Sequence, residues 1–277
     1  MKCALNSAFF RFFRTKAFLL VLIISLIIGA GIIFDTCTYV ISTSVFGRPR
    51  AIANDFLAYC IAKLAVVIPV AGAVFCTAFT GSDISYRSIN NKISTGINKV
   101  HIYLADYIVT VIALVMSSVI NLLMFYAFAK FVPQRSYIKI NSMITGLVLK
   151  SFIICLAYVS LYLLFQYFIS RKMLAIIMSL MLIPAVYMGT FLFEGILEEP
   201  YRKSVKNEQT EQVEWELNSK YVGGTTREVI DYVYKSSIFY VMDSEDFTCD
   251  NSYAVAGSVI ALSSALGLVA VNKKEYT

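Results

Sequence analysis

The sequence predicts an all-α integral membrane protein, built as one bundle of six spanning helices. Of its 277 residues, 58% are hydrophobic and only 15% are charged, and the mean hydropathy is +0.70. An ordinary soluble domain is roughly 45–50% apolar and about 25% charged. Six apolar runs reach the roughly 20 residues that a helix needs to cross a hydrocarbon core, and none alternates as a barrel strand would. We therefore expect residues 1–277 to form a single transmembrane domain.

The expected spans are, in chain order, Ala17–Phe34, Leu57–Thr80, Ile102–Ala129, Met143–Ile169, Leu174–Phe193 and Tyr253–Val271. The first run is longer than the 7–15-residue apolar core of a cleaved signal peptide, so we expect it to remain as a helix. Basic residues set the orientation. Eleven lie in the N-terminal segment, the second and fourth connections and the tail, against five in the first and third connections. This distribution predicts a multi-pass protein of the cell membrane with both termini in the cytoplasm.

The second connection, residues 81–101, predicts a short amphipathic helix on the cytoplasmic face. Ser82 or Asp83 can cap its start, Gly96 is the expected left-handed stop, and Asn98 can cap the helix of the third span. Its apolar residues recur at helical spacing along one stripe: Tyr86, Ile89, Ile93, Ile97 and Val100.

Two uses of this segment are open from its residues alone. In the first, the basic side chains bind anionic lipid headgroups at the membrane surface. In the second, the short helix is a rigid bracket between two spans, on which a cytoplasmic partner docks. The basic residues concerned are Arg87, Lys92 and Lys99.

Three ionisable residues fall inside the expected spans: Lys63, Asp106 and Lys150. Intramembrane charges are candidates for a transport pathway by default. Each of these three lies near the end of its span, however, where a long lysine can reach the headgroups or a charge can pair locally. Both interpretations remain open.

Several chemistries are excluded by missing motifs. The chain has no Gly-x-x-x-x-Gly-Lys-Ser/Thr phosphate loop, no His-Glu-x-x-His, no Cys-x-x-Cys and a single histidine, His101. We therefore expect no ATP site, no metal site and no catalytic residue. The positive charge is spread over the membrane-flanking segments, which speaks against a nucleic-acid surface. Of the six cysteines, Cys37 and Cys249 are both expected outside, where they could form a disulfide.

The fifth connection, residues 194–252, is expected to face outward as a small folded cap. It carries thirteen acidic against six basic residues and the only tryptophan, Trp215. Thr225 and Glu228 have the spacing of a capping box before a helical pattern that runs from Val229 to Tyr234. The alternative is a solvated loop with one or two helices and no role.

The second connection resembles the signature region of ABC type-2 export permeases, which are membrane subunits with six spans. In that family an acidic residue precedes a basic-polar stretch that ends in Asn-Lys. A glycine, a polar-basic pair and an aromatic opening of the third span follow. The matching positions are Asp83, Arg87, Asn91, Lys92, Gly96, Asn98, Lys99, Ile102 and Tyr103. His101 and Asp106 depart from the pattern, because many relatives carry uncharged or basic residues there.

Both ends of the chain are also similar to this family. The tail resembles the family ending through Gly267, Lys273, Lys274 and Glu275. Residues 1–16 resemble its elbow helix, an amphipathic helix along the membrane surface. The expected apolar stripe of that helix is Leu5, Ala8, Phe9, Phe12 and Phe13.

The resemblance implies half of an exporter that pairs with a second permease subunit, identical or related. Separate cytoplasmic ATPase subunits would bind ATP and Mg²⁺, while this chain would hold no cofactor. The coupling residues implied by the match are Asp83, Arg87, Asn91, Lys92, Gly96 and Lys99. Hinges within the spans are expected at Pro69 and Pro184, helped by Gly72 and Gly189, because proline removes a backbone hydrogen bond.

The cargo expected from the residues is hydrophobic or a cationic amphipathic peptide. The spans are rich in aromatic and aliphatic side chains, and the acidic cap attracts cations at long range. The rival hypothesis is a membrane sensor or assembly protein that transports nothing and whose cap binds an extracellular ligand. That rival predicts that Arg87, Lys92 and Gly96 can be replaced without loss of function.

Overall fold

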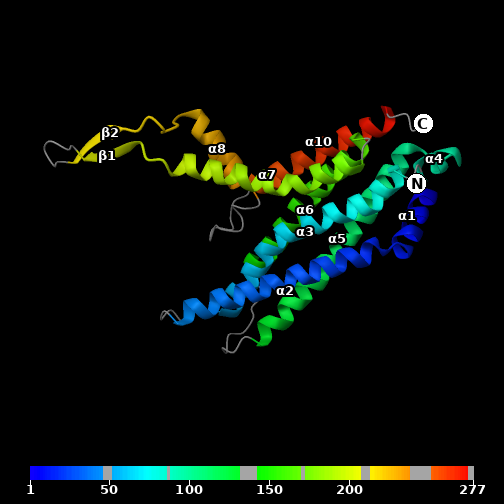
Figure 1. Ribbon diagram of the computed structural model, residues 1–277, viewed down its shortest axis with the longest axis horizontal. Coiled ribbons are helices and arrows are strands. Elements are labelled where there is room, and N and C mark those ends of the chain that lie inside the picture. Colours follow the sequence, from blue (N-terminus) through cyan, green and yellow to red (C-terminus); the bar gives the residue numbers. More distant parts are fainter. Residues whose placement is uncertain are drawn as a thin grey trace.

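The computed structural model describes residues 1–45, 52–85, 88–131, 142–169, 172–206, 213–237 and 251–273 (Figure 1). Within these ranges, six helices are long and apolar enough to cross a membrane. This confirms the predicted bundle of an all-α membrane protein. The six helices are α2 (Lys16–Val45), α3 (Ile52–Ser85), α5 (Lys99–Phe131), α6 (Ser142–Phe168), α7 (Lys172–Glu198) and α10 (Asn251–Lys273).

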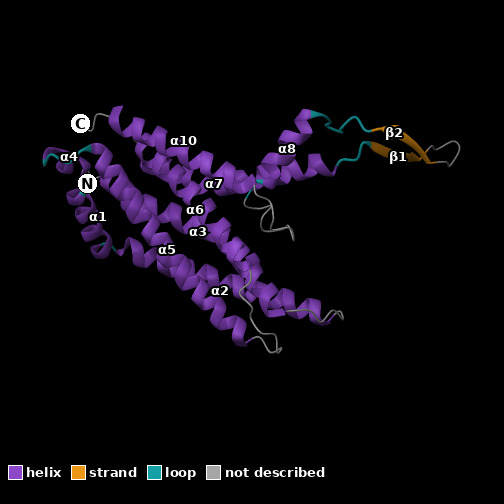
Figure 2. Cartoon of the chain, turned by 180° about the vertical axis from the view of Figure 1, so that it is seen from behind, coloured by secondary structure: helices purple, strands orange, loops and turns teal. Residues whose placement is uncertain are grey.

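The shorter elements lie at the two ends of the bundle. Helices α1 (Lys2–Arg14) and α4 (Ser88–Ser94) are at one end with the N-terminus and the last turns of α10, and we call this the α1 end (Figure 1). The opposite end carries helix α8 (Thr225–Lys235) and a hairpin of β1 (Arg202–Lys206) and β2 (Val213–Leu217), the two strands of the described chain (Figure 2).

Helix α3 is the centre of the bundle. It packs against α2, α5, α6 and α7, and its side chains Phe56, Cys60 and Phe75 are fully buried. Helices α2, α7 and α10 instead expose broad apolar faces, for example at Met181 and Leu266. Large exposed apolar faces are what lipid-facing helices require. The arrangement leaves α3 shielded from lipid and the peripheral helices in contact with it.

Helix α1 packs on α3 and α5 through Ala4, Ala8 and Phe12, which are spaced four residues apart and buried. The Phe12 ring meets the Phe75 ring of α3 at 6.0 Å between centroids. The predicted stripe was wrong at one position, because Phe13 is 78% exposed. Small alanines at two stripe positions let the helix approach closely, so the larger phenylalanine is left outside.

The segment between α7 and α10 is folded over its described part. Strands β1 and β2 pair antiparallel, with Arg202 opposite Leu217, and this hairpin was not predicted. The helix predicted after it is confirmed as α8, but the capping box is wrong. The N-cap is Gly224, with φ +67° and no side-chain cap hydrogen bond. Arg227 instead attaches the start of α8 to the end of α7, since its Nη2 donates a hydrogen bond to the carbonyl of Leu197 at 2.5 Å.

Candidate functional site at the α1 end

The bracket between α3 and α5 begins later than expected. Helix α3 continues to Ser85, so Ser82 and Asp83 lie in its last turn rather than at the start of α4. The Ser82 hydroxyl donates to the carbonyl of Phe79 at 2.8 Å, a bond within the same helix. The Asp83 carboxylate accepts a hydrogen bond from the hydroxyl of Ser88, the first residue of α4, at 2.7 Å. The predicted capping role was therefore wrong, and Asp83 links the two helices.

The end of the bracket is as predicted. Gly96 has φ +84°, and its N–H donates to the carbonyl of Ile93 at 2.9 Å. The N–H of Ile97 donates to the carbonyl of Lys92 at 3.1 Å, which completes a Schellman motif. The side-chain oxygen of Asn98 then accepts from the N–H of Val100 at 2.9 Å and caps α5. These bonds end α4 and begin α5, so that only the four residues 95–98 connect the two helices.

Gly96→Ala is expected to lower the free energy of unfolding by about 1–2 kcal/mol, because the left-handed conformation places Cβ against the following carbonyl. No neighbouring side chain contributes, since a Cβ at this glycine meets no atom within 4 Å. The measurement is thermal unfolding in detergent. Gly31→Ala is the control, because that glycine of α2 also has open space but ordinary helical geometry. Equal effects of the two changes would contradict the assigned turn.

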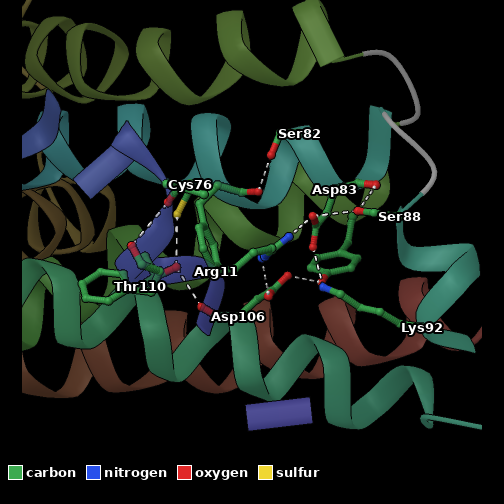
Figure 3. Close-up of polar contacts among 12 residues, drawn as sticks. Arg11, Cys76, Ser82, Asp83, Ser88, Lys92, Asp106 and Thr110 are labelled. Carbon is green, nitrogen blue, oxygen red and sulfur yellow. Dashed lines mark hydrogen bonds and ion pairs between the residues drawn. The ribbon is translucent and has the colours of Figure 1, made fainter. Parts of the chain in front are cut away.

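Asp83 is the hub of a buried cluster of charges (Figure 3). It is 4% exposed, and its carboxylate accepts from the Lys92 ammonium of α4 at 2.5 Å. It also forms an ion pair with the guanidinium of Arg11, which α1 directs into the bundle. One carboxylate therefore joins α1, α3 and α4.

Asp106 of α5 is the second carboxylate of the cluster and is fully buried. Its Oδ1 lies 3.6 Å from Nη2 of Arg11, and its Oδ2 accepts from the hydroxyl of Tyr167 of α6 at 2.7 Å. The Arg11 guanidinium also sits over the Phe79 ring, 4.1 Å from the centroid. We call Arg11, Asp83, Lys92 and Asp106, together with Tyr167, the ion network.

The ion network is electrically balanced, with two cations and two carboxylates. Burial lowers the pKa of both Arg11 and Lys92, and the nearby Asp106 carboxylate opposes this by raising the pKa of each. Buried charges persist only when they are paired. The pairing of opposite charges offsets the cost of their burial, and the ion network connects five helices: α1, α3, α4, α5 and α6.

The predicted coupling residues divide into two groups. Asp83 and Lys92 point into the bundle, where they are part of the ion network. Asn91 and Gly96 are exposed, and with Ser94 and Thr95 they form the outer surface of α4 and of the turn that follows it. Lys99 is half-buried at the start of α5, and Arg87 lies outside the described residues with Tyr86. A partner approaching α4 would meet Asn91 before it met Lys92.

The two intramembrane lysines are not part of this site. Lys63 forms an ion pair with Asp35 of α2, whose side chain is 67% exposed. Lys150 is 3% exposed, and its ammonium lies over the Tyr253 ring of α10 at 5.8 Å. Both lysines lie toward the end of the bundle opposite α1, away from the ion network. Their role in a transport pathway stays a prediction.

Other predicted positions lie apart from the ion network. Pro69 and Pro184 lie inside helices α3 and α7, which continue past them, so hinging there also stays a prediction. Cys249 is outside the described residues, which leaves its pairing with Cys37 a prediction. The described part of the chain brings together no group of three or more residues able to hold a metal ion.

Arg11 is the functional residue that the sequence interpretation missed. It was counted only as a positive charge for orientation. Its position is a signal in itself, because Arg11 follows Ala4 by seven residues and Ala8 by three, which puts it on the buried stripe of α1. A charge on the apolar face of an amphipathic helix indicates a buried partner.

Comparison with known proteins identifies no relative of this chain. No family model, no curated protein and no solved structure matches this chain. Inferences about function therefore depend on the residues and contacts described above.

Proposed function

We propose that this chain is the permease subunit of an ATP-driven ABC exporter, with separate ATPase subunits that dock at the α1 end. The observation that supports this most is the bracing of α4. A seven-residue helix on the surface of the bundle ends in a Schellman motif within the four-residue connection to α5 and is tied to α3 by the Lys92–Asp83 pair. Such bracing suits a part that receives force, and a passive surface loop has no need of it.

The ion network gives a route for that force. A push on the outer surface of α4 reaches α3 through Lys92 and Asp83. From Asp83 it passes to Arg11 of α1 and on to Asp106 of α5. Because packed interiors resist compression, paired charges at these distances move together. Movement of α4 would therefore shift α3 and α5 as a unit.

The cargo that we propose is hydrophobic or a cationic amphipathic peptide. The sequence of residues 194–252 carries thirteen acidic against six basic residues, and the spanning helices are apolar. Acidic groups at an exit raise the local concentration of cations. Cells with and without the protein should differ in tolerance to cationic bacteriocins. Unchanged tolerance across a panel of such peptides would remove this cargo class.

Asn91→Trp is expected to displace the ATPase subunits, because it places a bulky ring on the exposed surface of α4 without touching the ion network. The chain would be purified in mild detergent from its native membrane, and nucleotide-hydrolysing companions would be identified by mass spectrometry. We expect at least about tenfold less companion than with wild type, as for a lost interface anchor. Ser219→Trp is the matched control at the exposed far end of the molecule.

The rival hypothesis, a sensor or assembly protein, makes the opposite prediction for this experiment. It expects no nucleotide-hydrolysing companion with wild type, and no difference between the two tryptophan variants. Either result would contradict the exporter.

A further inference from the structure

A groove runs along the bundle between α5 and α6 with α3 as its floor. Ile61, Leu64 and Ile68 of α3 form the floor, and the walls are residues 115–122 of α5 and 148–155 of α6. It encloses about 140 Å³, and almost all of its lining is apolar. The groove opens toward the lipid-facing surface, where Val119 is 48% and Phe152 36% exposed on its two rims.

The groove lies at acyl-chain depth. The span of α6 begins at Ile144. At 1.5 Å per residue, Val148 and Cys155 are about 6 and 17 Å along the helix from that point. One leaflet contributes about half of a hydrocarbon core of about 30 Å. The groove therefore lies alongside the acyl chains of the leaflet at the end opposite α1. Its wall on α5, the eight residues 115–122, is about 10 Å long.

The chemistry of the walls excludes water as the occupant. A buried water needs two to four polar partners. The lining offers two hydroxyl groups, and that of Ser118 donates to the carbonyl of Leu114 in its own helix at 2.8 Å. The hydroxyl of Ser151 is buried without a hydrogen-bond partner among the described residues. One free hydroxyl cannot hold water in an otherwise apolar groove, whereas hydrocarbon gains dispersion contacts along its whole length.

We propose that this groove is a lipid site that binds one acyl chain of a bilayer phospholipid, from the leaflet at the end opposite α1. The site is a continuation of the lipid-facing surface at Val119 and Phe152, so a chain enters it sideways from the bilayer. The floor on α3 holds the chain inside the bundle instead of on its surface. A lipid held there is retained longer than lipids on the broad exposed faces of α7 and α10. This inference is independent of the proposed export function.

The first test uses the wild-type protein and a phosphatidylcholine that carries a diazirine in the middle of one acyl chain. The protein is reconstituted in vesicles of this lipid, transferred to lipid-free detergent and then illuminated. Labelled peptides are mapped by mass spectrometry. We expect label to persist on residues 115–122 and 148–155 and to fall by about tenfold on α7, as exposed lipid is diluted by detergent. Equal loss from groove and α7 would overturn the proposal.

The second test fills the groove. Ser118→Leu adds apolar volume to the α5 wall and removes only a hydrogen bond within its own helix. Native mass spectrometry after the same detergent exchange should find one phospholipid on wild type and about tenfold less on the variant. Ser258→Leu is the matched control, because Ser258 of α10 also donates to its own helix, at Val255, but faces outward. Undiminished lipid on Ser118→Leu, or lipid-free wild type, would contradict the assignment.

Discussion

Asp83→Asn is expected to lower the free energy of unfolding by about 3–5 kcal/mol, which is typical when one partner of a buried ion pair is removed. The change leaves Arg11 and Lys92 with only the Asp106 carboxylate between them. Two buried cations then share one anion, and a neutral amide cannot replace the second. Thermal and denaturant unfolding of the purified protein in the same detergent would measure the loss.

A second substitution separates charge balance from loss of shape. Lys92→Met removes one cation, so the double variant Asp83→Asn with Lys92→Met is neutral again, with Arg11 opposite Asp106. We expect it to be more stable than Asp83→Asn alone. Asp35→Asn breaks the exposed pair with Lys63 and is the control, with an expected cost below about 1 kcal/mol. Additive losses at positions 83 and 92 would contradict a shared buried network.

Arg11→Met is expected to release α1 from the bundle. Asp106 would keep its hydrogen bond from Tyr167 but lose the nearby Arg11 guanidinium, and α1 would keep its apolar contacts through Ala8 and the contact of the Met1 amine with the His101 ring at 3.2 Å. We expect a cost of about 3 kcal/mol. Hydrogen exchange of the backbone amides would detect it, with α1 exchanging about a hundredfold faster while α3 changes less.

Arg14→Met is the control for this prediction. Arg14 lies on the same helix but is exposed, with its guanidinium 5.7 Å from the Phe10 ring. It should leave the exchange of α1 unchanged. The double variant Arg11→Met with Asp106→Asn restores charge balance and should recover part of the protection. Similar effects of Arg11→Met and Arg14→Met would show that the buried guanidinium does not hold α1.

The bundle was predictable because a membrane imposes one requirement, an apolar helix of sufficient length, that the sequence states directly. The ends of the helices were less predictable. Helix α3 extends past the predicted Thr80 to Ser85, because its last turn is stabilised by contacts of Asp83 with other helices. The hairpin was missed for a different reason. Strand β1 (Arg-Lys-Ser-Val-Lys) has no alternating apolar pattern, whereas β2 (Val-Glu-Trp-Glu-Leu) alternates apolar and charged residues, and this signal of a strand was overlooked.

Local features of the site were predictable, and its long-range contacts were not. Gly96 and Asn98 act on neighbours within a few residues, so their roles follow from residue type alone. The pairing of Arg11 with Asp83 and Asp106 joins residues more than 70 positions apart, and only the packing of α1 brings them together. From the sequence we predicted that Lys92 contacts lipid or a partner at the surface. In the structure its ammonium pairs with Asp83 inside the bundle, and the neighbouring Asn91 is the exposed residue.

The most direct test of the central proposal places a photocrosslinking amino acid at Asn91 in intact cells. If α4 is where separate ATPase subunits dock, crosslinks from this position should capture a nucleotide-hydrolysing subunit. The same group at Ser219, at the opposite end, should not. Crosslinks from Asn91 that reach only phospholipid would contradict the exporter and leave α4 as a helix that lies on the membrane surface.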